Sequence, residues 1–145
     1  MTDRTQEFRA WVRGVYASEA AVEMLARGPR PGMLDDSRPW IEANGNWSVD
    51  LGDDYDVITA PLLTTSAAWP TSERAYVDVA VSLLGGDPVQ LDEVLPRLTR
   101  EHLEVVLAAM AHASGSHDHT DASAELLAAG ASPSRVGAAY PWPPA

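Results

Sequence analysis

The sequence predicts a mainly α-helical protein, folded as a single compact domain of five to six helices with one small β-hairpin. Two observations lead to this prediction. Apolar residues recur with helical spacing along most of the chain, and a short stretch near residues 39–51 changes to strict alternation. The chain has 145 residues, 46% of them hydrophobic, and no cysteine, which suits one domain with a core of its own. We place the helical domain at residues 1–130 and an extended, proline-rich tail at residues 131–145.

Residues 6–27 have the periodicity of an amphipathic helix. The apolar positions are Phe8, Trp11, Val12, Val15, Val22 and Leu25. Gly14 interrupts this pattern, and Ser18 could cap a second helix. The segment is therefore either one helix with a weak point or two short helices, and the glycines and prolines of residues 28–32 end it.

A β-hairpin is predicted for residues 39–43 paired with residues 46–51. Asn44-Gly45 lies between them, and this pair favours a type I′ turn because both residues tolerate positive φ. A lone hairpin is marginally stable in water, so we expect it to pack on the helices. Asp53 and Asp54 then indicate the start of a short helix to about Leu63.

The stretch from Ser72 to Ser114 is predicted to form the helical core. Thr71 or Ser72 caps a helix that is apolar nearly all round and should be buried, and Gly85-Gly86 end it. Asp92 is expected to cap a short helix to Leu98.

Thr99 is expected to cap an amphipathic helix that ends at Gly115. Its predicted core-facing residues are Leu103, Val106, Leu107 and Met110. A last short helix is predicted between residue 121 and Gly130.

Several of these core and cap residues form a recognisable run. They are Ser72-Glu73-Arg74, Ala80-Val81-Ser82-Leu83, Gly86-Asp87-Pro88-Val89-Gln90-Leu91, Leu95, Leu98, Ala111-His112-Ala113-Ser114-Gly115, and the earlier Ala20-Ala21-Val22-Glu23-Met24-Leu25. The run resembles small uncharacterised actinobacterial proteins over about half of the chain. The resemblance implies a helical architecture and a bacterial cytoplasmic protein, and it transfers no functional residue.

The charge balance restricts the classes of partner. The formal net charge is −11, and all ten basic residues are arginine. Nucleic acid and anionic membranes are disfavoured as partners, because both are negatively charged. Without lysine there is no Schiff-base chemistry and no P-loop lysine. We find neither a signal-peptide pattern nor a run of 18 apolar residues, so we expect a cytoplasmic location.

Histidines and aspartates suggest two candidate sites, a metal site and a docking surface. His112, His117 and His119 could ligate a metal, whereas the alternative is a helix C-terminus followed by a polar loop. Asp50, Asp53, Asp54 and Asp56 form an acidic patch that could dock on an arginine-rich partner. The alternative for this patch is a solvated turn with a helix cap, and no EF-hand fits, because Pro61 replaces the bidentate glutamate.

Tryptophan is used unusually often and supplies the remaining candidates. Trp40, Trp47 and Trp69, with Glu73 and His112, could line a ligand pocket or an interface. Alternatively, the tryptophans pin the hairpin onto the helices. In the tail, Pro141 and Pro144 have the P-x-x-P spacing that proline-binding domains read, with simple tail packing as the alternative.

We expect from these signals a non-catalytic protein-interaction or regulatory module of the immunity, inhibitor or adaptor type. It would bind a protein partner through an acidic surface, with a basic partner favoured by charge, and would need no cofactor. The alternative is a small-molecule or metal-binding protein, or an enzyme, with its site between the tryptophan-rich hairpin and the core helices. A third hypothesis is a homo-oligomer formed through the alanine-rich helix face.

Overall fold

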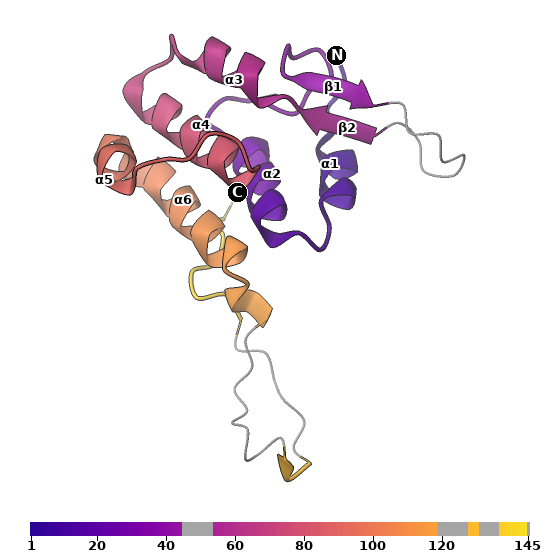
Figure 1. Cartoon of the computed structure of the whole chain (residues 1–145), viewed down its shortest axis with the longest axis vertical. Helices are drawn as coiled ribbons and strands as arrows, with labels where there is room; N and C mark the ends of the chain where they lie inside the picture. Colours follow the sequence, from indigo (N-terminus) through magenta and orange to yellow (C-terminus); the bar gives the residue numbers. More distant parts are fainter. Residues whose placement is uncertain (45–53, 119–127, 131–136, 145) are drawn as a thin grey trace.

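The computed structural model describes residues 1–44, 54–118, 128–130 and 137–144. Within these ranges the chain forms six α-helices and a two-stranded antiparallel sheet (Figure 1), which confirms the mainly helical fold class. The predicted last helix near residues 121–127 lies outside the described residues. None of the helices in the described ranges is long and apolar enough to cross a membrane.

The elements follow one another in a simple order, with two short 3₁₀ turns beside the last helix. They are α1 (Thr5–Trp11), α2 (Tyr16–Arg27), β1 (Ile41–Asn44), β2 (Asp54–Val57), α3 (Thr59–Ser66), α4 (Thr71–Leu83), α5 (Leu91–Val94), the 3₁₀ turn Leu95–Arg97, α6 (Arg100–Ala113) and the 3₁₀ turn Ser116–Asp118. In Figure 1, α4 lies in the middle of the molecule beside α2 and α6.

The N-terminal segment forms two helices rather than one. Gly14 has φ +94°, a left-handed conformation that glycine adopts without strain, and it separates α1 from α2. The Gly14 N–H donates a hydrogen bond to Glu19 Oε2 at 3.0 Å, so the first turn of α2 holds the connecting loop in place. Glu19 therefore lies in the first turn of α2, on the side of this helix that faces α6.

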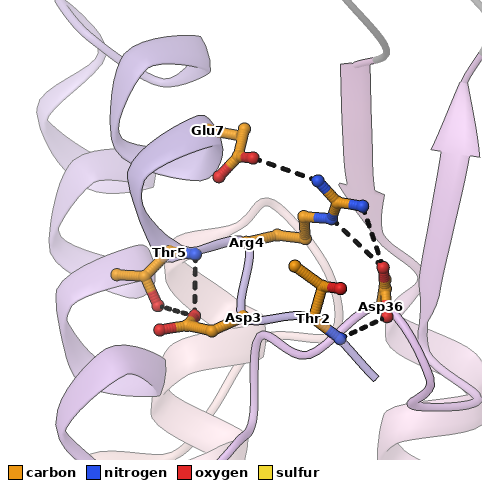
Figure 2. Close-up of polar contacts among 6 residues, drawn as sticks. All are labelled: Thr2, Asp3, Arg4, Thr5, Glu7 and Asp36. Atoms are coloured by element: carbon orange, nitrogen blue, oxygen red, sulfur yellow. Dashed lines mark hydrogen bonds and ion pairs between the residues drawn. The ribbon is translucent and has the colours of Figure 1, made fainter.

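Polar contacts attach the start of the chain to the loop before β1 (Figure 2). The Arg4 guanidinium donates to Asp36 Oδ2 from Nε at 3.2 Å and from Nη2 at 3.0 Å, and its Nη1 contacts Glu7. The Thr2 N–H donates to the other Asp36 oxygen at 2.8 Å. The same guanidinium lies 4.7 Å from the Tyr55 ring centre, so this network also supports β2.

The core is built from α2, α4 and α6, and α4 is buried as its all-round apolar pattern predicted. Its residues Ala75, Tyr76, Val77, Ala80 and Val81 are almost completely buried. The α2–α6 pair makes the most extensive contact of any two helices. Four alanines, namely Ala20, Ala21, Ala108 and Ala109, are at most 1% exposed. Small side chains let two helix backbones approach closely, which explains how these helices pack.

The orientation of α6 corrects the predicted stripe. Val106 is buried as expected, but Leu107 and Met110 are 36% and 39% exposed, while Val105, Ala108 and Ala109 face inward. The spacing rule chose the larger apolar residues, whereas the close approach of α2 requires the smaller ones. Because Ala108 and Ala109 are buried within the chain, they are not available for the predicted self-association through the alanine-rich face.

The sheet confirms a β element but not its predicted pairing. Ala43 pairs with Tyr55 and Asn44 with Asp54, so the partner of β1 is residues 54–57 and not residues 46–51, which lie outside the described residues. The prediction of a helix start at Asp53 and Asp54 is also wrong, since Asp54 begins β2 and α3 starts at Thr59. The physical reason is the alternation of Asp54–Val57, in which Tyr55 and Val57 are buried against the helices.

The helices begin close to the predicted residues, but the predicted caps of α4 and α5 are wrong. Thr99 caps α6 as expected, because its Oγ1 accepts the His102 N–H at 3.3 Å. Thr71 and Ser72 do not cap α4, because both lie inside the helix and Pro70 occupies the cap position. Asp92 likewise lies inside α5, where Gln90 precedes the first residue.

The packing of α2 on α6 generates a stability prediction. An Ala109→Leu substitution should lower the free energy of unfolding by about 1–3 kcal/mol, because the larger side chain overfills the close contact. Met110→Leu is the control, since it places leucine at an exposed position of the same helix and should change stability by less than about 0.5 kcal/mol. Urea unfolding measures both, and equal effects would show that Ala109 is not tightly packed in the core.

Candidate functional site

The most chemically diverse part of the described structure is the junction of α2, α6, the turn Ser116–Asp118 and residues 137–144. Glu19, in the first turn of α2, meets His112, in the last turn of α6. Their Oε1 and Nε2 atoms are 2.8 Å apart although the residues are 93 positions apart in sequence. The side chains are 22% and 21% exposed, so the pair is sheltered yet reachable from solvent.

Three aromatic rings surround His112. His117 stacks on it with ring centres 4.2 Å apart and planes at 9°, and Tyr16 meets His117 edge-on at 4.6 Å. Trp142 lies on another side, with its ring centre 6.1 Å from that of His112. The chain turns back over α6 at Gly115, which has φ +77° and where a Cβ would lie 3.2 Å from Tyr16. Glycine at this position therefore allows His117 to stack on His112.

The Glu19 carboxylate is stabilised in its charged form. Burial raises its pKa, but the Gly14 N–H and the His112 imidazole together outweigh that effect, so the pKa is lowered below the ordinary value of 4.5. A small cavity of about 180 Å³ opens beside the pair, lined by Arg9, Val12, Arg13, Glu19, Glu23 and His112. Water or a small polar group can therefore reach the Glu19–His112 pair.

Glu19, His112 and His117 are also a potential metal-ligand set. One ligand atom from each residue lies within 4.8 Å of the others. Two imidazoles and one carboxylate are a common donor set for zinc and for non-haem iron. An imidazole nitrogen binds a metal in the plane of its own ring, however, and the two rings are nearly parallel. His117 would have to turn out of the stack before both histidines could hold one ion.

The predicted histidine group is thus brought together in part. His112 and His117 are neighbours, and His119 lies outside the described residues. The sequence interpretation missed Glu19. The available signal was the shared face of Tyr16 and Glu19, three residues apart on α2. This face of α2 becomes part of the site only because α6 packs against it.

Residues 137–144 return across this junction rather than extending into solvent. The Ala139 N–H donates to Ser116 Oγ at 3.1 Å, and the Trp142 side chain packs against the core. The Arg27 guanidinium lies 5.1 Å from the Trp142 ring centre, and its Nη1 donates to the Pro143 carbonyl at 2.7 Å. The described part of the predicted tail has no helix or strand, and it is anchored to α2 and to the turn after α6.

A larger cavity of about 620 Å³ adjoins this anchored segment. Its lining residues are Arg9, Ala26, Arg27, Glu101, Glu104, Val105, Pro143 and Pro144. The walls therefore come from α1, α2, α6 and the C-terminal segment, and they carry charges of both signs.

The predicted tryptophan site separates into two groups. Trp40 is 1% exposed, donates from Nε1 to the Met33 carbonyl at 2.8 Å and meets Trp69 edge-on at 6.2 Å. The Arg30 guanidinium covers Trp69 at 4.2 Å and pairs with Glu73 at 2.9 Å. Trp47 lies outside the described residues. Trp40, Trp69 and Glu73 thus form one cluster, whereas the rings around His112 are Tyr16, His117 and Trp142.

A second histidine forms a hydroxyl–imidazole pair that joins two helix starts. Ser72 Oγ lies 2.6 Å from His102 Nδ1, and it accepts the Thr99 N–H at 2.9 Å. With His102 protonated on Nε2, the Ser72 hydroxyl can satisfy both partners, which ties the first turn of α4 to the first turn of α6. Glu73 and His112, which were predicted to share a site with the tryptophans, have separate partners, because Glu73 pairs with Arg30 and His112 with Glu19.

The acidic patch lies on the sheet as far as it is described. Asp54 and Asp56 belong to β2, and Asp50 and Asp53 lie outside the described residues. Asp56 is exposed and stands directly opposite Glu42 of β1, which is also exposed. Two like charges directly opposite each other on a sheet are unfavourable, so this pair does not stabilise the sheet.

Comparisons with known proteins add no relative to this picture. No protein-family model, curated protein or solved structure matches the chain.

The lowered pKa of Glu19 generates a prediction about pH. A carboxylate with a depressed folded-state pKa stabilises the protein above about pH 4.5, and this contribution is lost as pH falls through the folded value. Glu19→Gln should therefore cost about 1–2 kcal/mol at pH 5.5, and the difference from wild type should shrink at pH 3. Denaturant unfolding at both values tests this, with the exposed Glu93→Gln as control. A Glu19→Gln deficit that is the same at both pH values would contradict it.

Proposed function

We propose that the protein is a non-catalytic interaction module, of the immunity, inhibitor or adaptor type, that binds a basic partner protein through an acidic surface on its sheet. The observation that supports this proposal is the direct pairing of Glu42 with Asp56 across β1 and β2. We place the module in the bacterial cytoplasm, in line with the absence of cysteine and with the resemblance to actinobacterial proteins.

The charges around this pair support a cationic partner. Residues 42–56 contain five carboxylates, at positions 42, 50, 53, 54 and 56, and no basic residue. Some carboxylates of the described structure have arginine partners, such as Asp36 with Arg4 and Glu73 with Arg30. Among the described residues, by contrast, no ion pair involves Glu42 or Asp56. A basic partner would relieve their mutual repulsion and supply the missing countercharge.

The proposed acidic sheet surface, defined as Glu42 of β1 and Asp56 of β2, predicts a function–stability trade-off. Glu42→Gln/Asp56→Asn should raise the free energy of unfolding by about 0.2–1 kcal/mol by removing the opposed charges. The same variant should weaken binding to an arginine-rich peptide about tenfold at about 0.1 M salt, because each removed charge loses about 0.5–1 kcal/mol of attraction. Calorimetric titration and urea unfolding measure the two effects.

A matched control separates this surface from net charge alone. Glu93→Gln/Glu101→Gln removes two exposed carboxylates from α5 and α6 and changes the total charge by the same amount. It should leave peptide affinity within about twofold of wild type, since diffuse charge is screened beyond about 10 Å at 0.1 M salt. Equal losses in the two double variants would remove the sheet as the binding surface.

The second candidate function is binding of a divalent transition-metal ion by Glu19, His112 and His117. It is supported by the proximity of their ligand atoms, and it requires His117 to turn out of its stack on His112. The ion would replace the hydrogen bond between Glu19 and His112, and the neighbouring 180 Å³ cavity offers space for bound water as a further ligand.

Zinc titration tests the metal-binding candidate. Wild type should bind one Zn²⁺, and His117→Ala or His112→Ala should weaken affinity by at least about tenfold, since even outer-shell partners contribute about 10–100-fold. His102→Ala is the control histidine, because His102 contacts Ser72 instead. Absence of zinc binding by the wild type, or an equal loss in His102→Ala, would eliminate this site.

A further inference from the structure

The anchored C-terminal segment shows how the molecule holds an extended aromatic–proline peptide. Three features of residues 139–144 are recognised: the N–H of Ala139, the ring of Trp142 and the carbonyl of Pro143. Prolines lack an N–H, so a carbonyl is the only backbone hydrogen-bonding group that Pro143 can offer. These three features belong to any extended segment with a Trp-Pro pair, and none of them depends on the segment being joined to this chain.

The groups that hold the segment are themselves fixed by other contacts. The Arg27 Nε lies 3.6 Å from Glu23 Oε2, and Glu23 is held in turn by Arg9 of α1 at 2.5 Å. Ser116 Oγ also donates to the Ala111 carbonyl at 2.9 Å, which ties it to α6. Because these receptor groups have partners of their own, they form a site that is prepared before the peptide arrives.

The groove is larger than the part that the segment fills. The 620 Å³ cavity lies beside Pro143 and Pro144, which line its wall together with Arg27, Glu101 and Glu104. This volume falls in the range of about 300–1,000 Å³ that is typical of ligand sites. A longer segment, with polar residues after its Trp-Pro pair, would place those residues between the arginine and glutamate side chains.

We propose that the groove between α2 and α6 is a recognition site for an extended Trp-Pro segment of a partner protein, which residues 139–144 occupy in cis. An identical segment from a second copy would leave the 620 Å³ cavity unfilled, whereas a longer partner segment would extend into it. The site involves none of the residues of the acidic sheet surface and is independent of that proposal. A partner has to displace the resident segment, whose effective concentration for a flexibly linked ligand is about millimolar.

The test uses the full chain and a dye-labelled peptide with the sequence of residues 138–145. Trp142→Ala weakens the resident segment and should bind the peptide at least tenfold more tightly than wild type, as measured by fluorescence anisotropy. Trp11→Ala removes an exposed tryptophan elsewhere and should behave like wild type. A peptide in which alanine replaces tryptophan should not bind any of the three proteins.

A second substitution locates the site. Adding Arg27→Lys to Trp142→Ala keeps the positive charge beside Glu23 but removes the planar group that covers the Trp142 ring, and should weaken peptide binding about tenfold. Circular dichroism establishes that each variant is folded. If folded Trp142→Ala fails to bind the peptide, or if Arg27→Lys has no effect, the segment is only a structural strap. A wild-type dimer in light scattering that Trp142→Ala abolishes would identify a second copy as the occupant and overturn the proposal.

Discussion

The close packing of α2 against α6 is the constraint on which the rest of the structure depends. The two helices bury the alanines Ala20, Ala21, Ala108 and Ala109, and small side chains allow helix backbones to approach closely. The approach sets Glu19 beside His112 and also provides the two walls along which the C-terminal segment lies. The N-terminal helices and the C-terminal segment thus meet because α2 and α6 pack closely together.

The same packing explains why the junction is polar at its edge. Helix ends carry unsatisfied backbone groups and tolerate charged or polar side chains, and α2 begins where α6 ends. Glu19 and His112 therefore sit where a carboxylate and an imidazole are each favoured by the helix dipoles. Carboxylates such as Asp36, Glu23 and Glu73 have arginine partners, whereas Glu42 and Asp56 face each other across the two strands.

Helix positions could be predicted from the sequence because they depend on local physics. The burial of α4 follows from residues that are apolar all round, its end at Gly85 from a left-handed turn, and the start of α6 from the Thr99 cap. Strand pairing was mispredicted because Asn44-Gly45 is a strong local turn signal, whereas the actual register runs from Ile41 with Val57 to Asn44 with Asp54. The core-facing side of α6 was mispredicted because the spacing rule favours large apolar residues, whereas the buried positions of α6 include Ala108 and Ala109.

By itself, the sequence determined the helical class, the boundaries of the central helices, the acidic balance and the grouping of His112 with His117. These properties follow from residue spacing, capping and composition, which act over a few positions of the chain. Only the tertiary structure decided that Glu19 completes the histidine cluster, that Ser72 bonds to His102, and that Arg27 holds Trp142 and Pro143. Each of these contacts joins residues 30 or more positions apart, and such proximity arises from helix packing, which no local pattern encodes.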